Sequence, residues 1–474
     1  MPRPPDSRTL ADLKAAAGAG GWLEVPADIE PYLHDWRRLY HGASPLVLLP
    51  RDVAELSRIL AVCDRDETAV VPQGGNTSYC GAATPDESGA QVVIGLERMH
   101  RLRQIDAADF CMTVEAGMTL AAAQSVAREA GRLFPLSLGS EGTAQIGGNL
   151  GTNAGGTAVL RFGMMRDLVL GLEVVLADGR VLSTLTRLRK DNTGYDVRSM
   201  FIGAEGTLGI ITAASLKLFP LPADSATALV GTGSPRHALE LMIRLREAAG
   251  DQLTSFEIMP RRAVELTVHH IAGVANPLEQ PAPWFALIEL TSPNPRQQLA
   301  ALLAAELEAA LDAGAVIDAA IATSLAQAQA MWRLRESVPE AQTRHGASLK
   351  HDISVPVSAL PLLEERGAEL VRALAPDGEL IAYGHVGDGN LHFNVSQREG
   401  ADRATFLAGK AVLEGAIFDL VASLGGSFSA EHGIGRLKAA ELARRTDPVE
   451  YGLMRALKRT LDPKGILNPG KVLS

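Results

Sequence analysis

Residues 139–156 of the chain read GSEGTAQIGGNLGTNAGG, a stretch rich in glycine with hardly any hydrophobic anchor. A packed core has no need of such a segment, and an ordered one usually lies against something flat or phosphorylated, because glycine allows close backbone approach. Two further glycine-rich stretches accompany it: residues 72–78 (PQGGNTS), after a strand-like run ending at Val71, and residues 203–212 (GAEGTLGIIT), which lead into a strand. Consecutive glycines can aim several backbone N–H groups at one anion. Taken alone, the loop at 72–78 is equally compatible with a turn that serves only the fold.

The usual nucleotide-binding fingerprints are absent from this sequence. No GxGxxG opens a helix after a strand, and no GxxxxGK[ST] occurs, which argues against a dinucleotide-binding Rossmann site and against a P-loop. Three glycine-rich loops without those fingerprints indicate a long dinucleotide that is held mainly by backbone groups.

The order and spacing of the three loops resemble the vanillyl-alcohol-oxidase-type flavoproteins. The matching motifs are Pro-x-Gly-Gly-x-Thr at 72–77, Ile-Gly-Gly-Asn at 146–149 with Thr-Asn-Ala-Gly-Gly at 152–156, and Gly-x-Glu-Gly-Thr-Leu-Gly at 203–209. The resemblance implies an α+β chain: a PCMH-type FAD-binding domain of two subdomains, a substrate domain with an antiparallel sheet, and a C-terminal helix that returns to the FAD domain.

The same resemblance implies FAD, with the first loop at the pyrophosphate and the second along the flavin and ribityl chain. The implied cofactor residues are Gln73, Gly74, Gly75, Asn76, Thr77, Ser78, Leu138, Gly142, Thr143, Gly147, Gly148, Asn149, Asn153, Ala154, Gly155, Gly156, Glu205, Gly206, Gly209, Ile210 and Asn468. Some members attach the flavin through a histidine in these loops. Here no histidine lies between His100 and His237, so we expect non-covalent FAD.

Composition limits the class of protein. The 474 residues carry a formal net charge of −10, which disfavours a general nucleic-acid or anionic-membrane binder, and the 46% hydrophobic content is that of a soluble globular chain. No run approaches the roughly 20 apolar residues that span a bilayer, and the N-terminus lacks the apolar core of a secretion signal. Cys63, Cys80 and Cys111 form no pairing framework, so we expect reduced thiols and a cytoplasmic location.

Two composition regimes meet near residue 220, where residues 218–224 (LFPLPAD) read as a linker. Strand-like runs alternate with glycine-rich loops before it, and longer Ala/Leu/Glu-rich segments follow it. We expect a strand from Ala228, a helix at 237–249, strands at 253–259 and 284–291, and a helix at 295–313. This order predicts an antiparallel sheet with helices on one face. The expected parts are an N-terminal segment (1–41), an FAD domain (42–222), a substrate domain (223–440), and a C-terminal segment packing on the FAD domain (441–474).

Two glycine-flanked turns in the second half carry histidines and a carboxylate. Residues 384–395 (GHVGDGNLHFNV) predict a hairpin-like reversal that brings His385 toward His392, and residues 427–436 (SFSAEHGIGR) place Glu431 beside His432. Two histidines and one carboxylate can hold a metal while leaving a position open for substrate. Upstream, the planar guanidinium of Arg335 and the positive charge of Lys350 could bind a substrate carboxylate. The sequence is equally compatible with a pair of solvated basic residues that bind no ligand.

Within the flavoproteins the chain resembles the D-2-hydroxy-acid dehydrogenase branch, most closely the D-2-hydroxyglutarate dehydrogenases. The resemblance implies His385, His392 and Glu431 as metal ligands, with zinc the expected ion. It also implies His432 as the catalytic histidine, and Arg335, Lys350 and Asn394 at the substrate. Residues 35–37 (DWR) and 40–42 (YHG) match the branch as well. Where the branch can carry a threonine four residues after the arginine, this chain has Pro339, which removes a hydroxyl contact.

The expected reaction is oxidation of an anionic D-2-hydroxy acid to the 2-oxo acid, with proton removal by His432 and hydride transfer to the flavin. D-lactate or glycolate oxidation remains open, as do a flavin subunit of a glycolate-oxidase-type complex and a non-redox relative of the alkyl-glycerone-phosphate synthases. The electron acceptor, whether an electron-transferring flavoprotein, a quinone or a cytochrome, is also open, and so is a homodimer.

Overall fold

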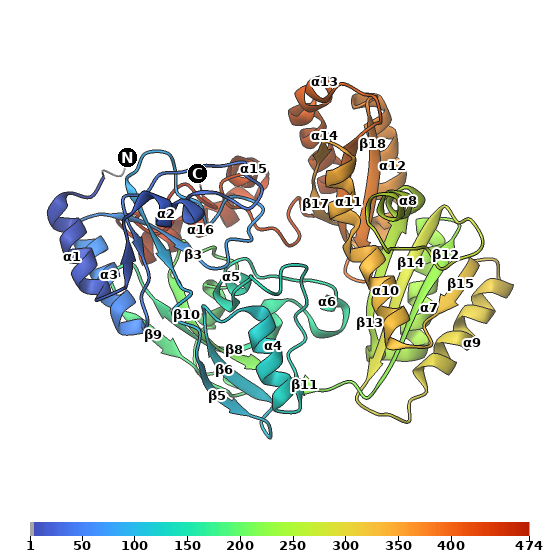
Figure 1. The fold of residues 1–474 in the computed structure, drawn as a ribbon, viewed down its shortest axis with the longest axis horizontal. Helices are drawn as coiled ribbons and strands as arrows, with labels where there is room; N and C mark the ends of the chain where they lie inside the picture. The colour runs from blue at the N-terminus through green and yellow to red at the C-terminus, as the bar shows by residue number, and fades with distance from the viewer. Residues whose placement is uncertain (1–3, 474) are drawn as a thin grey trace. The chain divides into compact units, whose positions relative to one another are not determined.

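The computed structural model describes residues 4–473, which divide into two compact units (Figure 1). Unit 1 comprises the described residues up to Gly156, Gly163–Leu221 and the residues from Glu431 onward, whereas unit 2 comprises Thr157–Phe162 and Pro222–Ala430. The C-terminal helices α15 (Ala439–Arg445) and α16 (Pro448–Leu461) belong to unit 1, so the prediction that a C-terminal helix returns to the FAD-binding part is confirmed.

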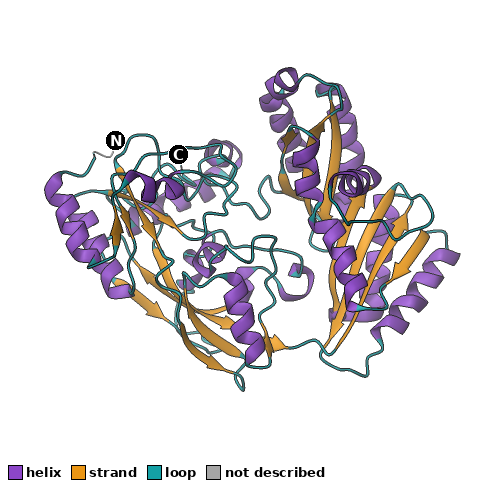
Figure 2. Ribbon diagram, in the orientation of Figure 1, coloured by secondary structure: helices purple, strands orange, loops and turns teal. Residues whose placement is uncertain are grey.

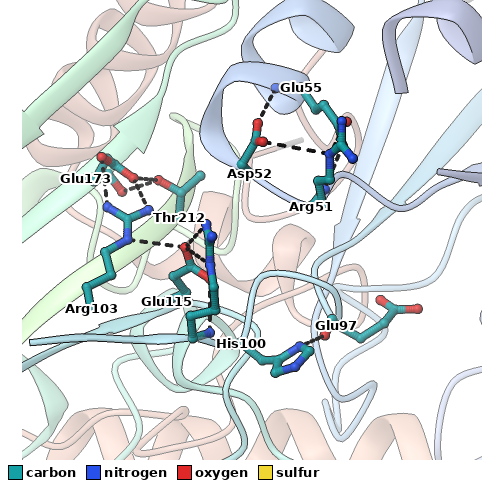
Figure 3. Close-up of polar contacts among 10 residues, drawn as sticks. Arg51, Asp52, Glu55, Glu97, His100, Arg103, Glu115, Glu173 and Thr212 are labelled. Atoms are coloured by element: carbon teal, nitrogen blue, oxygen red, sulfur yellow. Dashed lines mark hydrogen bonds and ion pairs between the residues drawn. The ribbon is translucent and has the colours of Figure 1, made fainter. Parts of the chain in front are cut away.

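Unit 1 contains a small sheet from which the first glycine-rich loop emerges. Its strand order is β1 (Trp22–Leu23), β2 (Val47–Leu48), β4 (Gln91–Gly95), β3 (Ala69–Gln73), and the last three strands are parallel. Helix α3 (Val53–Arg65) starts where the carboxylate of Asp52 accepts a 2.9 Å hydrogen bond from the N–H of Glu55, a contact visible in Figure 3. Strand β3 is buried along its length except at Pro72, and it ends at the loop 72–78.

The second sheet of unit 1 is antiparallel and supports the other two loops. Its strand order is β5 (Leu102–Asp106), β6 (Cys111–Glu115), β10 (Ile210–Lys217), β8 (Val169–Val175), β9 (Val181–Thr184). Figure 3 shows Arg103 between two buried carboxylates: its guanidinium lies 3.2 Å from Glu115 and 2.9 Å from Glu173, and Glu173 also accepts a 2.8 Å bond from Thr212. Buried carboxylates need such partners, and this network links the four neighbouring strands β5, β6, β10 and β8.

Unit 2 is built on one antiparallel sheet with helices on both faces (Figures 1 and 2). Its main path is β15 (Val316–Ile321), β12 (Asp224–Thr232), β14 (Trp284–Ser292), β13 (Leu253–Pro260), β18 (Gly378–His385), β19 (Asn390–Gln397), β16 (Ser348–Leu349), and β17 (Asp352–Ser354) also pairs with β19.

The prediction of helices on one face only was wrong. Strand β14 buries Ala286 and Ile288 against helices α7 (Pro235–Ala249) and α9 (Leu299–Asp312), and it buries Phe285 and Leu287 against the opposite group of helices. Because side chains alternate across a strand, two apolar sets require a cover on each side. The second cover consists of helices α8 (Arg261–His270), α10 (Leu325–Glu336) and α11 (Val338–His345).

The remaining elements complete the two units. In unit 1 they are α1 (Ser7–Ala17), α2 (Pro26–Leu33), α4 (Leu120–Glu129), α5 (Ile146–Gly151), β7 (Arg132–Leu133), β11 (Phe219–Pro220) and the 3₁₀ turns Met165–Leu168 and Arg198–Met200. In unit 2 they are α6 (Val159–Phe162), α12 (Leu360–Leu374), α13 (Arg403–Ala408), α14 (Lys410–Ser423) and the 3₁₀ turns Gly250–Gln252 and Val357–Ala359.

Most expected elements are present, and the α+β class is confirmed. The helix expected from residue 295 begins only at Leu299, four residues later. The three cysteines are buried thiols that form no disulfide among the described residues. Across residues 4–473, none of the helices combines the length and the apolar character needed to cross a membrane.

Candidate functional site

The first glycine-rich loop of unit 1 packs directly against the second. Gln73, which is 3% exposed, donates two hydrogen bonds of 3.0 and 2.7 Å to backbone carbonyls, and Asn76 donates one of 2.7 Å. A Cβ atom on Gly75 would lie 1.9 Å from the carbonyl oxygen of Thr143. Glycine at 75 is therefore required by the contact between the loops themselves.

The second loop leaves open space and unpaired acceptors. A Cβ atom on Gly142 or Gly148 would meet no atom within 4 Å among the described residues. Two buried amide oxygens of this loop, those of Gln145 and Asn149, and a third outside it, that of Asn468, have no hydrogen-bond partner in the part of the chain that the structure describes. Buried acceptors normally find a donor. The loops thus fit a ligand that lies against backbone and offers N–H or O–H groups, as the flavin and adenine rings of FAD do.

The third loop anchors the turn that follows His432. Glu205 is 7% exposed, has a φ of +49°, and accepts backbone hydrogen bonds of 2.7 Å from Ile434 and 2.9 Å from Gly435. Burial raises the pKa of Glu205 to about 7, although these two N–H donors act in the opposite direction. The side-chain amide of Asn468 donates a 2.8 Å bond to the Glu205 carbonyl oxygen. The contacts of Glu205 are thus with the protein's own backbone.

Several predicted cofactor residues have packing roles that need glycine. A Cβ atom on Gly206 would lie 2.3 Å from Pro72, and one on Gly209 would lie 2.6 Å from Val174. Gly156 has a φ of +102°, and a Cβ atom there would lie 2.0 Å from a backbone oxygen. The other predicted cofactor residues lie in the same loops or at their ends: Gly74, Thr77, Ser78, Leu138, Thr143, Gly147, Asn153, Ala154, Gly155 and Ile210.

Glu431 and His432 both belong to unit 1, next to these loops. The carboxylate of Glu431 accepts a 2.6 Å hydrogen bond from the backbone N–H of Gly156. The imidazole of His432 stacks on Tyr79, with ring centroids 4.2 Å apart and planes 4° from parallel. Trp36 contacts the Tyr79 ring at 5.2 Å. The stack fixes the plane of the His432 ring.

In unit 2 the predicted reversal brings two histidines together. Strands β18 and β19 pair as an antiparallel hairpin, in which His385 lies opposite Asn390 and Tyr383 lies opposite His392. The two imidazole centroids are 5.6 Å apart, with planes at 74°. The expected approach of His385 and His392 is therefore confirmed.

A fully buried carboxylate lies behind His385. Glu257 pairs in register with His385 across β13 and β18, and its Oε1 lies 2.5 Å from the imidazole Nδ1. Its Oε2 accepts a 2.7 Å hydrogen bond from Nε of Arg335 on α10, whose guanidinium also lies over the ring of Tyr383 at 4.9 Å. Burial opposes ionisation of Glu257, but the Arg335 charge and the His385 ring outweigh it and lower its pKa to about 2. The carboxylate is thus charged at neutral pH and joins the two predicted site residues.

His392 also faces a buried carboxylate. Its Nδ1 lies 3.8 Å from Oδ1 of Asp352, which is 1% exposed and accepts a 2.9 Å hydrogen bond from the amide of Asn390. The carboxylate of Glu257, 2.5 Å from Nδ1 of His385, assigns that nitrogen as the proton-bearing one and Nε2 as the one suited to ligate a metal, an arrangement typical of metal-binding histidines. The 3.8 Å contact of His392 is too long for a hydrogen bond and does not assign its tautomer.

The other predicted substrate residues are placed differently. Asn394 is 2% exposed, and its side-chain amide donates a 2.9 Å hydrogen bond to Gln342. Its side-chain oxygen accepts a 3.3 Å hydrogen bond from a backbone N–H. Lys350 lies in the short connection between β16 and β17. Pro339 occupies the first turn of α11, where its missing N–H is not needed.

Sequence reasoning missed Glu257, Asp352 and Tyr79. A signal existed for Glu257, because it is the one charged residue in an otherwise uncharged strand, LTSFEIMP at 253–260. Nothing local in the sequence distinguishes Tyr79, since its partner His432 lies more than 350 positions further along the chain.

Comparison with known proteins agrees with this geometry. Residues 221–472 match the family model of the FAD linked oxidases, C-terminal domain, and residues 44–185 match that of an FAD binding domain. The chain therefore belongs to the FAD-linked oxidases and has the FAD-binding domain of that class. The solved structure of p-cresol methylhydroxylase with substrate bound superposes with a TM-score of 0.77 at 16% identity, over 98% of this chain and 96% of that one, which shows the shared fold.

Two curated relatives specify the family further. The mitochondrial D-2-hydroxyglutarate dehydrogenase of Arabidopsis thaliana is 37% identical over 99% of this chain and 82% of its own length. The mitochondrial D-2-hydroxyglutarate dehydrogenase of Bos taurus is 40% identical over 96% of this chain and 81% of its own length. The chain is a member of the D-2-hydroxyglutarate dehydrogenase family.

Proposed function

We propose that the chain oxidises D-2-hydroxyglutarate to the corresponding 2-oxo acid, with non-covalently bound FAD as the hydride acceptor. The observation that carries this proposal is the arrangement in unit 2, where Glu257 links the imidazole of His385 to the guanidinium of Arg335. A metal-binding imidazole next to an anion-binding cation suits a substrate with a hydroxyl beside a carboxylate. The relatives' names supply the identity of the acid.

Residues of the chain bind the substrate and accept its hydroxyl proton. Arg335 and Lys350 bind substrate carboxylate oxygens, and Asn394 holds the strand on which His392 lies through its bond to Gln342. His432, with its ring held against Tyr79, accepts the hydroxyl proton, a role for which an imidazole is suited at neutral pH.

The donor set also fits a divalent cation. As the proposed ligands, His385, His392 and Glu431 would supply two nitrogens and one oxygen, a set that zinc accepts while keeping a position for substrate. When bound, FAD supplies the hydride acceptor and the cation supplies Lewis-acid stabilisation of the alkoxide oxygen.

Several finer points belong to the same proposal. The FAD domain spans residues 42–222 and the substrate domain residues 223–440, flanked by the segments 1–41 and 441–474. The proposed electron acceptor is an electron-transferring flavoprotein, a quinone or a cytochrome; the proposed location is the cytoplasm, and the proposed assembly is a homodimer. The relatives' names instead carry a mitochondrial location, so fractionation of the native cell tests this point.

The experiment is flavin bleaching under anaerobic conditions with a panel of 2-hydroxy acids. D- and L-2-hydroxyglutarate, D-lactate, malate and glycolate are compared with and without a chelator; the shorter acids are included because Pro339 replaces a threonine of the branch. We expect the D-2-hydroxyglutarate reaction to be the fastest and to stop after metal removal. Equal bleaching by both enantiomers, or none by any acid, contradicts the proposed reaction. Undiminished bleaching after chelation contradicts the metal.

A further inference from the structure

One side chain of unit 2 contacts both a proposed metal ligand and a proposed substrate-binding cation. Glu257 has no exposed surface, and its two oxygens are used separately: Oε1 faces Nδ1 of His385 at 2.5 Å, and Oε2 accepts from Nε of Arg335 at 2.7 Å. The three residues come from three elements, β13, β18 and α10. The carboxylate is therefore a bridge between two functional groups.

We propose that Glu257 is a positioning residue that orients the metal-ligating imidazole of His385 and the anion-binding guanidinium of Arg335 at the same time. Metal affinity and substrate affinity then depend on one buried side chain that need not contact either ligand. This inference rests on the proposed function, because it assigns a metal to His385 and a substrate carboxylate to Arg335.

On the His385 side, the carboxylate acts through the imidazole tautomer. An acceptor 2.5 Å from Nδ1 keeps the proton on that nitrogen, so the lone pair resides on Nε2, where a metal binds. The contact is enforced by the sheet, because Glu257 and His385 are register partners on neighbouring strands. Removing a carboxylate of this kind behind a metal-ligating histidine typically weakens metal binding about 10- to 100-fold.

On the Arg335 side, the carboxylate fixes the direction of the guanidinium. Only Nε is used by Glu257, and the plane of the group is set by the Tyr383 ring, 4.9 Å away. A guanidinium held at Nε directs its two terminal nitrogens as a pair, which is the geometry that grips a carboxylate. Without the anchor the side chain loses this orientation.

The chain offers two matched controls on the same sheet. Asp352 lies 3.8 Å from the imidazole of His392, and it is not among the contacts of Arg335 that the described residues show. Glu289 on β14 is a half-buried carboxylate that accepts a 2.6 Å hydrogen bond from the indole N–H of Trp332. Neither control should affect both functions.

The experiment compares Glu257→Gln, Asp352→Asn and Glu289→Gln with the unmodified FAD-loaded protein. Zinc affinity is measured by competition with a chromophoric chelator in the absence of substrate, and the KM for D-2-hydroxyglutarate is measured by flavin reduction at saturating zinc. An amide at 257 can accept only one of the two hydrogen bonds, so we expect zinc affinity to fall about 10- to 100-fold and KM to rise about tenfold. D352N should lower zinc affinity alone, and E289Q should leave both constants unchanged.

The outcomes distinguish a failure of the positioning role of Glu257 from a failure of the proposed function. If the unmodified protein neither binds zinc nor reduces its flavin, the proposed function fails. If it does both and E257Q retains the same zinc affinity and KM, the positioning role is overturned. Should E257Q not fold, Glu257→Asp carries the test: it keeps the charge that pairs with Arg335 but shortens the reach toward His385, and unchanged zinc affinity in that variant overturns the proposal.

Discussion

Replacing Gly148 tests whether this glycine is needed by the bound cofactor or by the fold. It lies inside the short helix α5 with a negative φ, and a Cβ atom there would meet no atom within 4 Å among the described residues. Replacing a helical glycine by alanine stabilises a helix by about 0.5–1 kcal/mol. If the space beside Gly148 holds FAD, the same methyl group crowds the cofactor at a cost of about 1–3 kcal/mol, or about 5- to 150-fold in its dissociation constant.

The measurement combines thermal unfolding of the FAD-free protein with an FAD titration followed by flavin fluorescence. We expect Gly148→Ala to raise the midpoint of the FAD-free protein slightly and to weaken FAD binding. Gly452 is the matched control, because it lies in helix α16 of the same unit and its Cβ would also meet no atom within 4 Å. Gly452→Ala should give the same stabilisation and leave FAD affinity unchanged. A G148A variant that binds FAD as tightly as the unmodified protein would refute the assignment of the second loop to the cofactor.

Three further predictions concern stability. Gly75→Ala places a Cβ atom 1.9 Å from the Thr143 carbonyl oxygen, so we expect the midpoint of the FAD-free protein to fall by several degrees, whereas a rise would contradict the close contact. Burial raises the pKa of Glu205 from 4.5 to about 7, so the native state binds this proton more tightly than the unfolded state does. The protonated carboxyl therefore adds to the free energy of unfolding. This contribution is complete below about pH 4.5 and is lost as the pH rises through 7. The loss amounts to about 3 kcal/mol, and urea unfolding of Glu205→Gln should lack this part of the pH dependence. Arg335→Met leaves the buried charge of Glu257 without its guanidinium partner, so the free energy of unfolding measured in urea should fall by about 3–5 kcal/mol. A double variant that also carries Glu257→Gln should recover part of that loss. No recovery would contradict the pairing of the two side chains.

The parts of this protein that depend on short sequence segments could be predicted. The loops at 72–78, 139–156 and 203–212 were found because glycines at fixed spacing have few uses other than close backbone approach. The hairpin that brings His385 near His392 was found because its turn and the two-residue period of a strand are both local. The antiparallel sheet of unit 2 could be predicted from the order of its elements, whereas the class of the whole fold was implied by the family resemblance.

Tertiary structure alone decided which residues support those local features. Glu257 lies 128 positions before His385 and 78 before Arg335, and only the pairing of β13 with β18 and the packing of α10 bring the three together. The same holds for Tyr79 against His432 and for the helices on the second face of the unit 2 sheet. A sequence determines which side chains are available and where strands reverse, whereas register between distant strands is set by the burial of whole faces, which no local segment contains.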